Sequence, residues 1–344
     1  MITGSLIDRI FSAASIERWN EYPRPAVFTE LGKQAHKMAI AWVLARSREG
    51  QGEAVDWTAL VECGILEFLH RVVVTDIRLP VFDWLMEDAE VKARLDDWVC
   101  KALERDLSAL AAPLCPRQPE REKNTLRTAH YLATRWEFGF IYKWAGGVVY
   151  GIEDTKRDIE AAGVEKTQGI AREMLSPSPG SEAAGLWGFI SMFGQLAFQK
   201  RWAQTPRVPP TSVLGHAMFV AVVSYLLALE VEAGAGVAVD AFFGGLFHDL
   251  PEVLTRDIAS PIKTSVDGLD SLIHRYERDG MERNVLPLLP EAWRGQLRKY
   301  TESFRWPGGE IVEFCDKLAA YVEASESIRM GLHPRVLEDA RRGL

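Results

Sequence analysis

Four residues in the second half of the chain have the right types to bind a metal ion. They are His216, the adjacent pair His248-Asp249, and Asp316. Neutral imidazoles and carboxylates together suit first-row divalent cations such as Mn²⁺, Co²⁺, Fe²⁺ or Zn²⁺, and they suit Mg²⁺ less well. An adjacent His-Asp pair also occurs by chance in many proteins, so the surrounding sequence decides whether this set is a metal site.

The context of the His-Asp pair favours a site. The segment GGLFHDLPEVLTRDI places both side chains at the polar end of a strongly apolar stretch. Glu252 follows His248 by about one helical turn and can project toward the same side. Pro251 fits the first turn of a helix better than its interior. We therefore expect His216, the His-Asp pair and Asp316 to lie on three different helices that meet at one point.

Most of the chain has the periodicity of helices. Segments 31–46, 91–110 and 309–328 carry apolar residues at intervals of three and four. Convincing alternating strands are absent; the best candidate, HRVVVTDI at 70–77, is short and also fits a helix end that enters a loop. The sequence predicts an all-α fold.

Length and composition restrict the class of protein. A chain of 344 residues favours two domains, and 47% hydrophobic with 26% charged residues excludes wholesale disorder. The net charge of −8 argues against a protein that coats nucleic acid or a membrane surface. The four cysteines have no paired spacing, the N-terminus lacks signal-peptide features, and the longest apolar run, 217–229, is short for a bilayer. We expect a cytoplasmic protein whose partners are small molecules, with no nucleic acid polymer and no membrane.

The two halves of the chain resemble each other. Arg18-Trp19 and Arg201-Trp202 are each followed, at the same spacing, by a Pro-Arg pair. Three further positions then pair in the same order: His36 with His216, His70 with His248, and His130 with Asp316. The pattern predicts a tandem duplication of one helical bundle. Its expected parts are a first domain at 1–175, a linker at 176–190 that contains SPSPGS, and a second domain at 191–344.

The order H…HD…D, with HDLPEVLTRDIASPIK after the central pair and CDKLAAY around the last Asp, resembles the HD-domain metal-dependent phosphohydrolases. Within them it is similar to the bacterial 5′-deoxynucleotidase branch, which removes phosphate from deoxynucleoside monophosphates. The resemblance covers residues of about 195 to 325 and includes the preceding Arg-Trp pair. It implies two tandem HD-domain-like helical bundles.

The resemblance also implies roles for single residues. A divalent metal would polarise the phosphoryl group and lower the pKa of a bound water toward neutrality. Arg201 would bind the phosphate, where a planar bidentate donor is favoured. The remaining roles are: His216, His248, Asp249 and Asp316 as metal ligands, Glu252 and Asp257 as catalytic groups, Trp202 beside the sugar, Lys263 as added positive charge, and Thr255 as support for the loop.

Two features differ from the branch. The family commonly has Glu-His-Ser at the first ligand, and this chain has Gly215-His216-Ala217. The loop between Trp202 and His216 also differs, because it carries three prolines. Both changes lie where a sugar or base would be read, so they affect the expected substrate preference more than the metal site.

The first half has lost part of this pattern. Arg71 stands in the position of the central Asp, and a cation there would repel a divalent metal. We expect a degenerate copy that packs against the active one as an intramolecular pseudo-dimer. The rival interpretation is that His36, His70 and His130 form a vestigial site for a metal or an anion, which Arg71 helps to hold.

The leading functional hypothesis is a metal-dependent phosphomonoesterase that hydrolyses (deoxy)nucleoside 5′-monophosphates. Another phosphate ester, a nucleoside triphosphate or a cyclic nucleotide are alternatives within the same chemistry. A non-catalytic nucleotide-binding sensor or scaffold is the alternative from a different class. Retention of all four ligands together with Glu252 favours an enzyme. His274 and His333 have no partner pattern and are expected to be surface residues.

Overall fold

Helices form nearly all the regular structure of the described residues, so the predicted all-α fold is confirmed. The computed structural model describes residues 2–75, 77, 81, 84–85, 87–107, 119–258 and 266–342. Asp76, Cys115 and Lys263 lie outside these ranges. The two strands within them, β1 (Glu17–Arg18) and β2 (Phe28–Thr29), form one short antiparallel pair.

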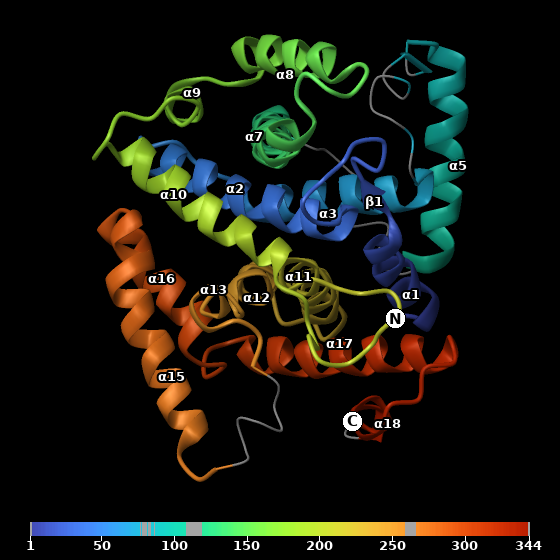
Figure 1. The fold of residues 1–344 in the computed structure, drawn as a ribbon, viewed down its shortest axis with the longest axis vertical. Coiled ribbons are helices and arrows are strands. Elements are labelled where there is room, and N and C mark those ends of the chain that lie inside the picture. The colour runs from blue at the N-terminus through green and yellow to red at the C-terminus, as the bar shows by residue number, and fades with distance from the viewer. Residues whose placement is uncertain are drawn as a thin grey trace.

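The first half begins with α1 (Gly4–Ser12) and a short 3₁₀ turn, η1 (Ala13–Ser15). The longer helices that follow wrap around α2, and α5 stands at the edge of the molecule (Figure 1). Their bounds are α2 (Glu30–Gly50), α3 (Trp57–Val74), α5 (Ala89–Leu107), α7 (Glu120–Ala145), α8 (Ile152–Lys166) and α9 (Gly169–Glu173).

The second half is built around α11, the most apolar long helix. The elements of this half are α10 (Glu182–Gly194), η2 (Gln195–Phe198), α11 (Val213–Glu230), α12 (Ala235–Phe247), α13 (Glu252–Thr255), α15 (Leu269–Gly280), η3 (Met281–Val285), η4 (Leu286–Leu288), α16 (Glu291–Glu302), α17 (Gly309–Arg329) and α18 (Arg335–Arg342). Helix α11 is long and apolar enough to cross a membrane by composition, and 83% of it is buried inside the molecule. It is thus placed as the core helix of a globular fold.

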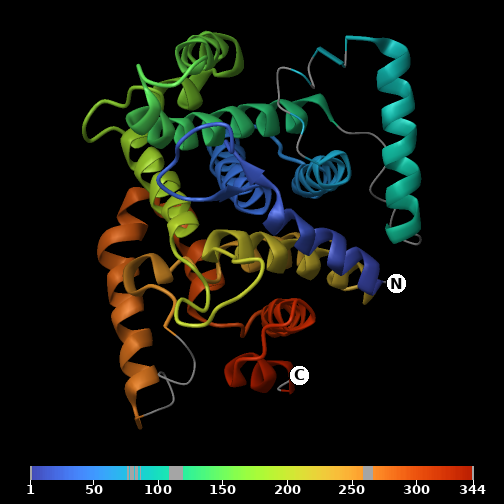
Figure 2. The same cartoon turned by 45° about the vertical axis from the view of Figure 1, so that its right-hand side comes forward.

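Helices α2 and α11 pack together in the middle of the molecule, with α7 on the far side of α2 and α17 on the far side of α11 (Figures 1 and 2). Their first turns lie side by side: a Cβ atom placed on Gly32 would lie 3.6 to 3.9 Å from Thr29, Ser212 and Leu214. These are ordinary van der Waals distances, so the first turns of α2 and α11 are in packing contact at this point.

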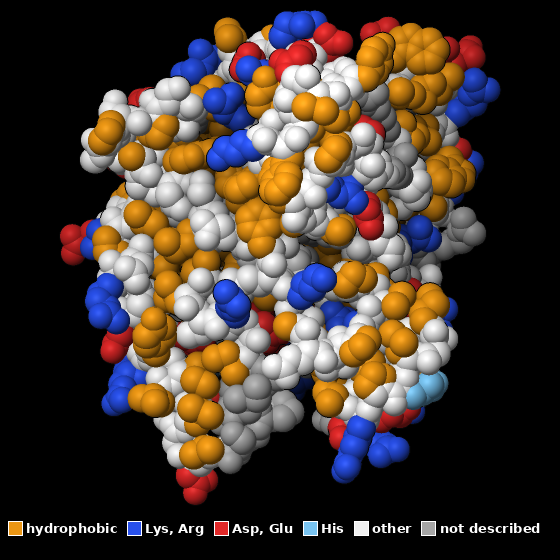
Figure 3. All heavy atoms as spheres, in the orientation of Figure 1, with side chains coloured by type: hydrophobic (Ala, Val, Ile, Leu, Met, Phe, Trp, Pro, Cys, Tyr) orange, Lys and Arg blue, Asp and Glu red, His pale blue; other side chains and the backbone are white. Residues whose placement is uncertain are grey.

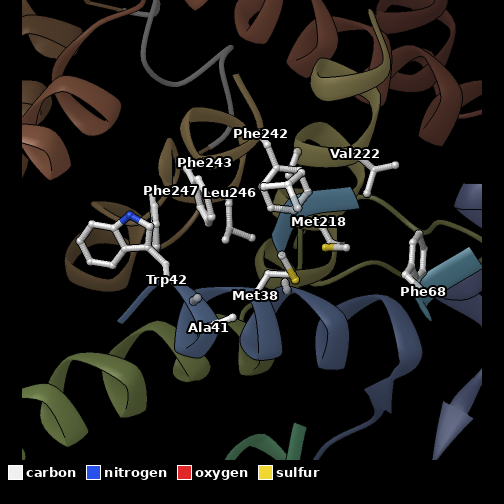
Figure 4. Packing of buried hydrophobic residues seen from close by; sticks show 14 of the residues in the cluster. Met38, Ala41, Trp42, Phe68, Met218, Val222, Phe242, Phe243, Leu246 and Phe247 are labelled. Atoms are coloured by element: carbon white, nitrogen blue, oxygen red, sulfur yellow. The ribbon is translucent and has the colours of Figure 1, made fainter. Parts of the chain in front are cut away.

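A single hydrophobic core runs through both halves. Trp42 of α2 packs against Phe247 of α12, with 5.3 Å between the ring centroids, and Met38 and Phe68 belong to the same cluster (Figure 4). Burial of such large side chains is the main stabilising contribution to a fold of this size. The halves are therefore joined through shared apolar surface as well as through the chain.

The predicted linker at 176–190 is only partly a linker. Helix α10 begins at Glu182, and Ser181 caps it by accepting a hydrogen bond from the Ala184 amide. Phe189 and Phe193 on this helix are fully buried, and Phe193 packs on Phe247. Residues 182–190 thus belong to the core, while the division into two domains stays a prediction.

The described part of the ambiguous segment 70–77 contains a helix end. His70 to Val74 complete α3, and Thr75 then adopts a left-handed φ of 63°. Arg256, which follows α13, has almost the same φ, 65°. The two halves therefore leave the corresponding part of the bundle through the same rare backbone conformation.

Candidate metal centre

Three helical segments bring the predicted ligands together. Ser212 caps α11 by accepting from the Gly215 amide, which places His216 as the fourth residue of that helix. His248 directly follows the last residue of α12, and Asp249 lies in the turn after it. Asp316 projects from α17. The expected meeting of three helices is what the structure has.

The four side chains converge on one point. His216 Nε2 lies 3.0 Å from Asp316 Oδ1 and 3.5 Å from Asp249 Oδ2. His248 Nε2 lies 3.2 Å from Asp249 Oδ1 and 3.8 Å from Asp316 Oδ1. The ring centroids of the two histidines are 5.3 Å apart. One atom from each of His216, His248 and Asp249 can be chosen so that all lie within 4.8 Å of one another.

The ring nitrogens fit a metal better than they fit hydrogen bonds. His216 is fully buried, and neither of its ring nitrogens makes a hydrogen bond to any described residue. His248 Nδ1 contacts the Gly245 carbonyl oxygen at 2.8 Å, while its Nε2 has no such partner. The Nε2 atoms of both rings face carboxylate oxygens at 3.0 to 3.8 Å, and a divalent cation bound among these nitrogens and oxygens would satisfy them all.

The electrostatics of the cluster agree with this interpretation. Burial alone would lower the pKa of His248, but Asp249 and Asp316 outweigh it and raise that pKa well above its usual value. Burial alone would raise the pKa of Asp249, but the two histidines bring it down to about 2. The carboxylates are thus held ionised, which is the form that binds a divalent cation, and they also hold a proton on His248. A divalent cation would take the place of that proton, because a metal binds the neutral imidazole.

Arg201 and Trp202 lie beside the centre, as predicted. Arg201 Nη1 is 3.5 Å from Asp249 Oδ2, so the guanidinium reaches the edge of the metal cluster. The Trp202 backbone amide donates to Asp257 Oδ2 at 3.0 Å. Trp202 itself has a left-handed φ of 57°. The structure therefore gives Asp257 a visible contact with the Arg-Trp segment.

Sequence reasoning missed Glu323 on α17. This carboxylate is 2% exposed, accepts from the Trp202 indole N–H at 2.8 Å, and lies 3.3 Å from Arg201 Nε. It also accepts from Thr211 and lies 3.5 Å from Arg207. Burial would raise its pKa, but the two arginines lower it to about 2. Glu323 fixes the position of the Arg-Trp pair.

The other residues singled out in the sequence are Glu252, Thr255, His274, His333 and Lys263. Glu252 is buried at the start of α13, in the turn after Asp249. The Thr255 hydroxyl donates to Glu277 at 2.7 Å, a contact that supports the loop. His274 and His333 are 64% and 61% exposed, as expected of surface residues. Lys263 lies outside the described residues, so its predicted role stays a prediction.

The structure does not gather the three histidines of the first half into a cluster. His36 Nε2 contacts the Ile190 carbonyl oxygen at 2.9 Å, and its ring packs on Trp136. His70 Nε2 faces Asp96 at 3.7 Å. Within the described ranges, the second-half set is the one group of His, Cys, Asp and Glu close enough to hold a metal.

The contacts of the first half correct the predicted pairing of His36 with His216. Thr29 caps α2 by accepting from Gly32, just as Ser212 caps α11, so the fourth residue of α2 is Lys33. The Trp19 indole donates to Glu137 at 2.8 Å, as Trp202 does to Glu323. The match of Glu137 with Glu323 also supports the pairing of His130 with Asp316. His130 lies seven residues before Glu137, and Asp316 lies seven residues before Glu323.

Lys33 stands where the second half has its first ligand. Its side chain is fully buried, donates to the Thr134 hydroxyl, and lies 3.6 Å from Glu137. Arg18 joins Glu137 to Glu30, and Arg71 lies 3.9 Å from Glu30. The first half thus places cations where the second half has an imidazole and a carboxylate.

Two imidazoles and two carboxylates that converge beside an arginine in a helical bundle could hold a divalent metal ion, as the resemblance to HD-domain proteins implies. In Figure 3 the surface is hollowed between the parts that carry α15 and α18, and basic side chains lie at the upper edge of this hollow.

Comparison with known proteins finds similarity to 5′-deoxynucleotidases over part of the chain. Residues 188–335 match the family described as 5′-deoxynucleotidase YfbR-like. Over 158 residues the chain is 27% identical to a 5′-deoxynucleotidase of Vibrio vulnificus, covering 44% of this chain and 81% of that protein. A 5′-deoxynucleotidase of Shewanella oneidensis is 27% identical over 148 residues, 41% of this chain and 75% of the relative. No solved structure matches. The resemblance to the 5′-deoxynucleotidase branch of the HD-domain proteins is confirmed for this part of the chain.

Proposed function

We propose that the chain is a metal-dependent nucleotidase that hydrolyses (deoxy)nucleoside 5′-monophosphates. The observation that carries the proposal is the convergence of His216, His248, Asp249 and Asp316 at a buried point that Arg201 adjoins. The similarity of residues 188–335 to 5′-deoxynucleotidases supports it.

The protein's own residues divide the work. A divalent metal held by the four ligands supplies a polarising charge and a water of lowered pKa. The buried His216 and His248 keep their ligand nitrogens away from bulk water. Arg201, held by Glu323 on one side and facing Asp249 on the other, presents a planar cation to the phosphate.

Proton transfer and sugar contact fall to neighbouring groups. Glu252, one turn after His248 and buried, would accept the proton from the attacking water. Asp257 orders the segment through the Trp202 amide, and Trp202 with its indole tied to Glu323 would form a wall for the sugar. Asp257 therefore acts first as a positioning group in this proposal.

The first half is proposed to be a degenerate duplicate that forms an intramolecular pseudo-dimer with the second. The shared features are the cap of α2 and α11, the indole-to-carboxylate bond, and the left-handed Trp19 and Trp202. A cytoplasmic location remains a prediction of the sequence.

A phosphate-release assay tests the function. Full-length protein with Mn²⁺, Co²⁺ or Mg²⁺ is given deoxynucleoside and ribonucleoside monophosphates, a triphosphate and a cyclic nucleotide. We expect metal-dependent release from the monophosphates. Release from the triphosphate alone would show that the substrate is a nucleoside triphosphate and not a monophosphate. Tight nucleotide binding without phosphate release with any of the metals would favour the sensor hypothesis.

A further inference from the structure

A cavity of about 430 Å³ lies between helices of the first half and the start of the second half, and none of the proposed metal ligands lines it. It lies where α7, α8 and α10 meet (Figure 2). Aromatic rings form much of its wall, among them Trp136, Phe140 and Trp187. A cavity of 300 to 1,000 Å³ with apolar walls and a few polar groups is typical of small-molecule sites.

The charges in this cavity have one predominant sign. Arg135, Lys143 and Lys156 line it, and Glu160 is the one acidic residue among its lining groups. Lys156 Nζ lies 4.6 Å from the Tyr142 ring. This excess of cations stands out on a chain with a net charge of −8. Aromatic walls with several cations are complementary to a planar aromatic ligand that carries negative charge.

We propose that the cavity is a second binding site for a nucleoside monophosphate. The base would pack against the aromatic wall, and the phosphate would lie toward Lys143 and Lys156, which stand at the more exposed side. Ser191 of α10 and Gln195 of η2 line the same cavity and offer polar contacts to the sugar or the base.

The position of α10 gives this site a route to the metal centre. One side of the helix lines the cavity through Trp187, and Phe193 packs on Phe247, the residue just before His248. The chain then runs from the end of α10 through η2 directly to Arg201. A ligand in the cavity would therefore change the rate of phosphate release. This effect rests on the proposed function, whereas binding of the ligand to the cavity does not rest on it.

Gly139 offers a specific way to block the cavity. It lies on α7 at the cavity wall, and a Cβ atom placed there would meet nothing within 4 Å. A Cβ atom at this position has open space, so Gly139→Leu would place a bulky side chain at the cavity wall, and replacing a helical glycine favours the helix. Gly295→Leu is the matched control, because Gly295 is also helical and also has open space at its Cβ position, on α16.

The test is binding of deoxyadenosine monophosphate to the full-length chain in EDTA, measured by calorimetry. We expect about one equivalent bound, at least a tenfold loss of affinity in Gly139→Leu, and no change in Gly295→Leu. The double variant Lys143→Glu, Lys156→Glu should also lose at least tenfold in affinity. This second variant tests the site even if thermal melting shows that Gly139→Leu does not fold.

Two further arms separate the ligand chemistries. Deoxyadenosine and inorganic phosphate should each bind at least tenfold more weakly than the monophosphate. Absence of binding, equal binding of inorganic phosphate, or binding that Arg201→Ala removes and Gly139→Leu does not would each overturn the second site. Because EDTA prevents turnover, these outcomes do not depend on whether the chain is a nucleotidase.

Discussion

The two halves of this protein place different chemistry on matching helices. In the second half, the fourth residue of α11 is His216, whose ring nitrogens have no hydrogen-bond partner among the described residues. In the first half, the fourth residue of α2 is Lys33, which is bonded to Thr134 and lies beside Glu137. The second half leaves lone pairs for a cation to bind, whereas the first half fills the matching position with the amino group of Lys33.

What the halves keep in common is the Arg-Trp-carboxylate contact. Arg18, Trp19 and Glu137 repeat the contacts of Arg201, Trp202 and Glu323. Since the contact persists where the metal ligands are lost, part of its role is structural. In the second half Arg201 additionally reaches Asp249. Of the two Arg-Trp pairs, Arg201-Trp202 adjoins the proposed metal ligands, and it is therefore the pair proposed to bind substrate.

The largest expected effect is the loss of the metal. Asp249→Ala removes a ligand that faces both histidines, so we expect metal binding to disappear and phosphate release to fall by roughly a thousandfold. The matched control is Asp96→Ala in the first half, which removes the partner of His70 and should leave release unchanged. Equal losses in both variants would contradict the distinction between the halves.

The next effect separates the two buried carboxylates. Glu323→Gln and Glu137→Gln each weaken a buried contact with an arginine, so both should lower the melting temperature. Only Glu323→Gln should raise KM for the nucleotide, by about tenfold, because only Arg201 is proposed to bind phosphate. A similar rise in KM for Glu137→Gln would indicate that the substrate binds in the first half.

Much of the metal centre could be predicted from the sequence, because a ligand pattern depends on residue type and order. His216, His248, Asp249 and Asp316 converge as expected. Glu323 was missed since a single Glu inside an amphipathic helix carries no signal until the fold brings Trp202 to it. The sequence paired His36 with His216 because the two match in type, whereas the helix caps at Thr29 and Ser212 pair Lys33 with His216, three residues earlier.

A smaller effect concerns pH. Burial lowers the pKa of Lys33 to about 7, although Glu137 partly opposes this. Between pH 7 and about 10 the unfolded chain therefore binds more protons than the folded one, so stability rises with pH in this window. Relative to Lys33→Met, the unfolding free energy of the wild type should increase by at most about 1.4 kcal/mol per pH unit. Denaturant titrations at several pH values measure this slope, and a flat or falling difference would show that Lys33 stays fully charged.

The smallest expected effect is at the exposed histidines. His274→Ala and His333→Ala each remove a surface contact with an acidic residue. The unfolding free energy should change by less than about 0.5 kcal/mol, and the bound metal should not change. A loss of metal from either variant, measured by elemental analysis, would mean that the ligand set is incomplete.

The comparison of the halves depends most directly on how many metal ions one chain binds, and where. Anomalous diffraction from crystals grown with Mn²⁺, together with elemental analysis in solution, measures both. We predict one ion per chain, surrounded by His216, His248, Asp249 and Asp316, and no ion near Lys33. A second ion between Lys33 and His130, or one that remains bound in Asp249→Ala, would contradict the account.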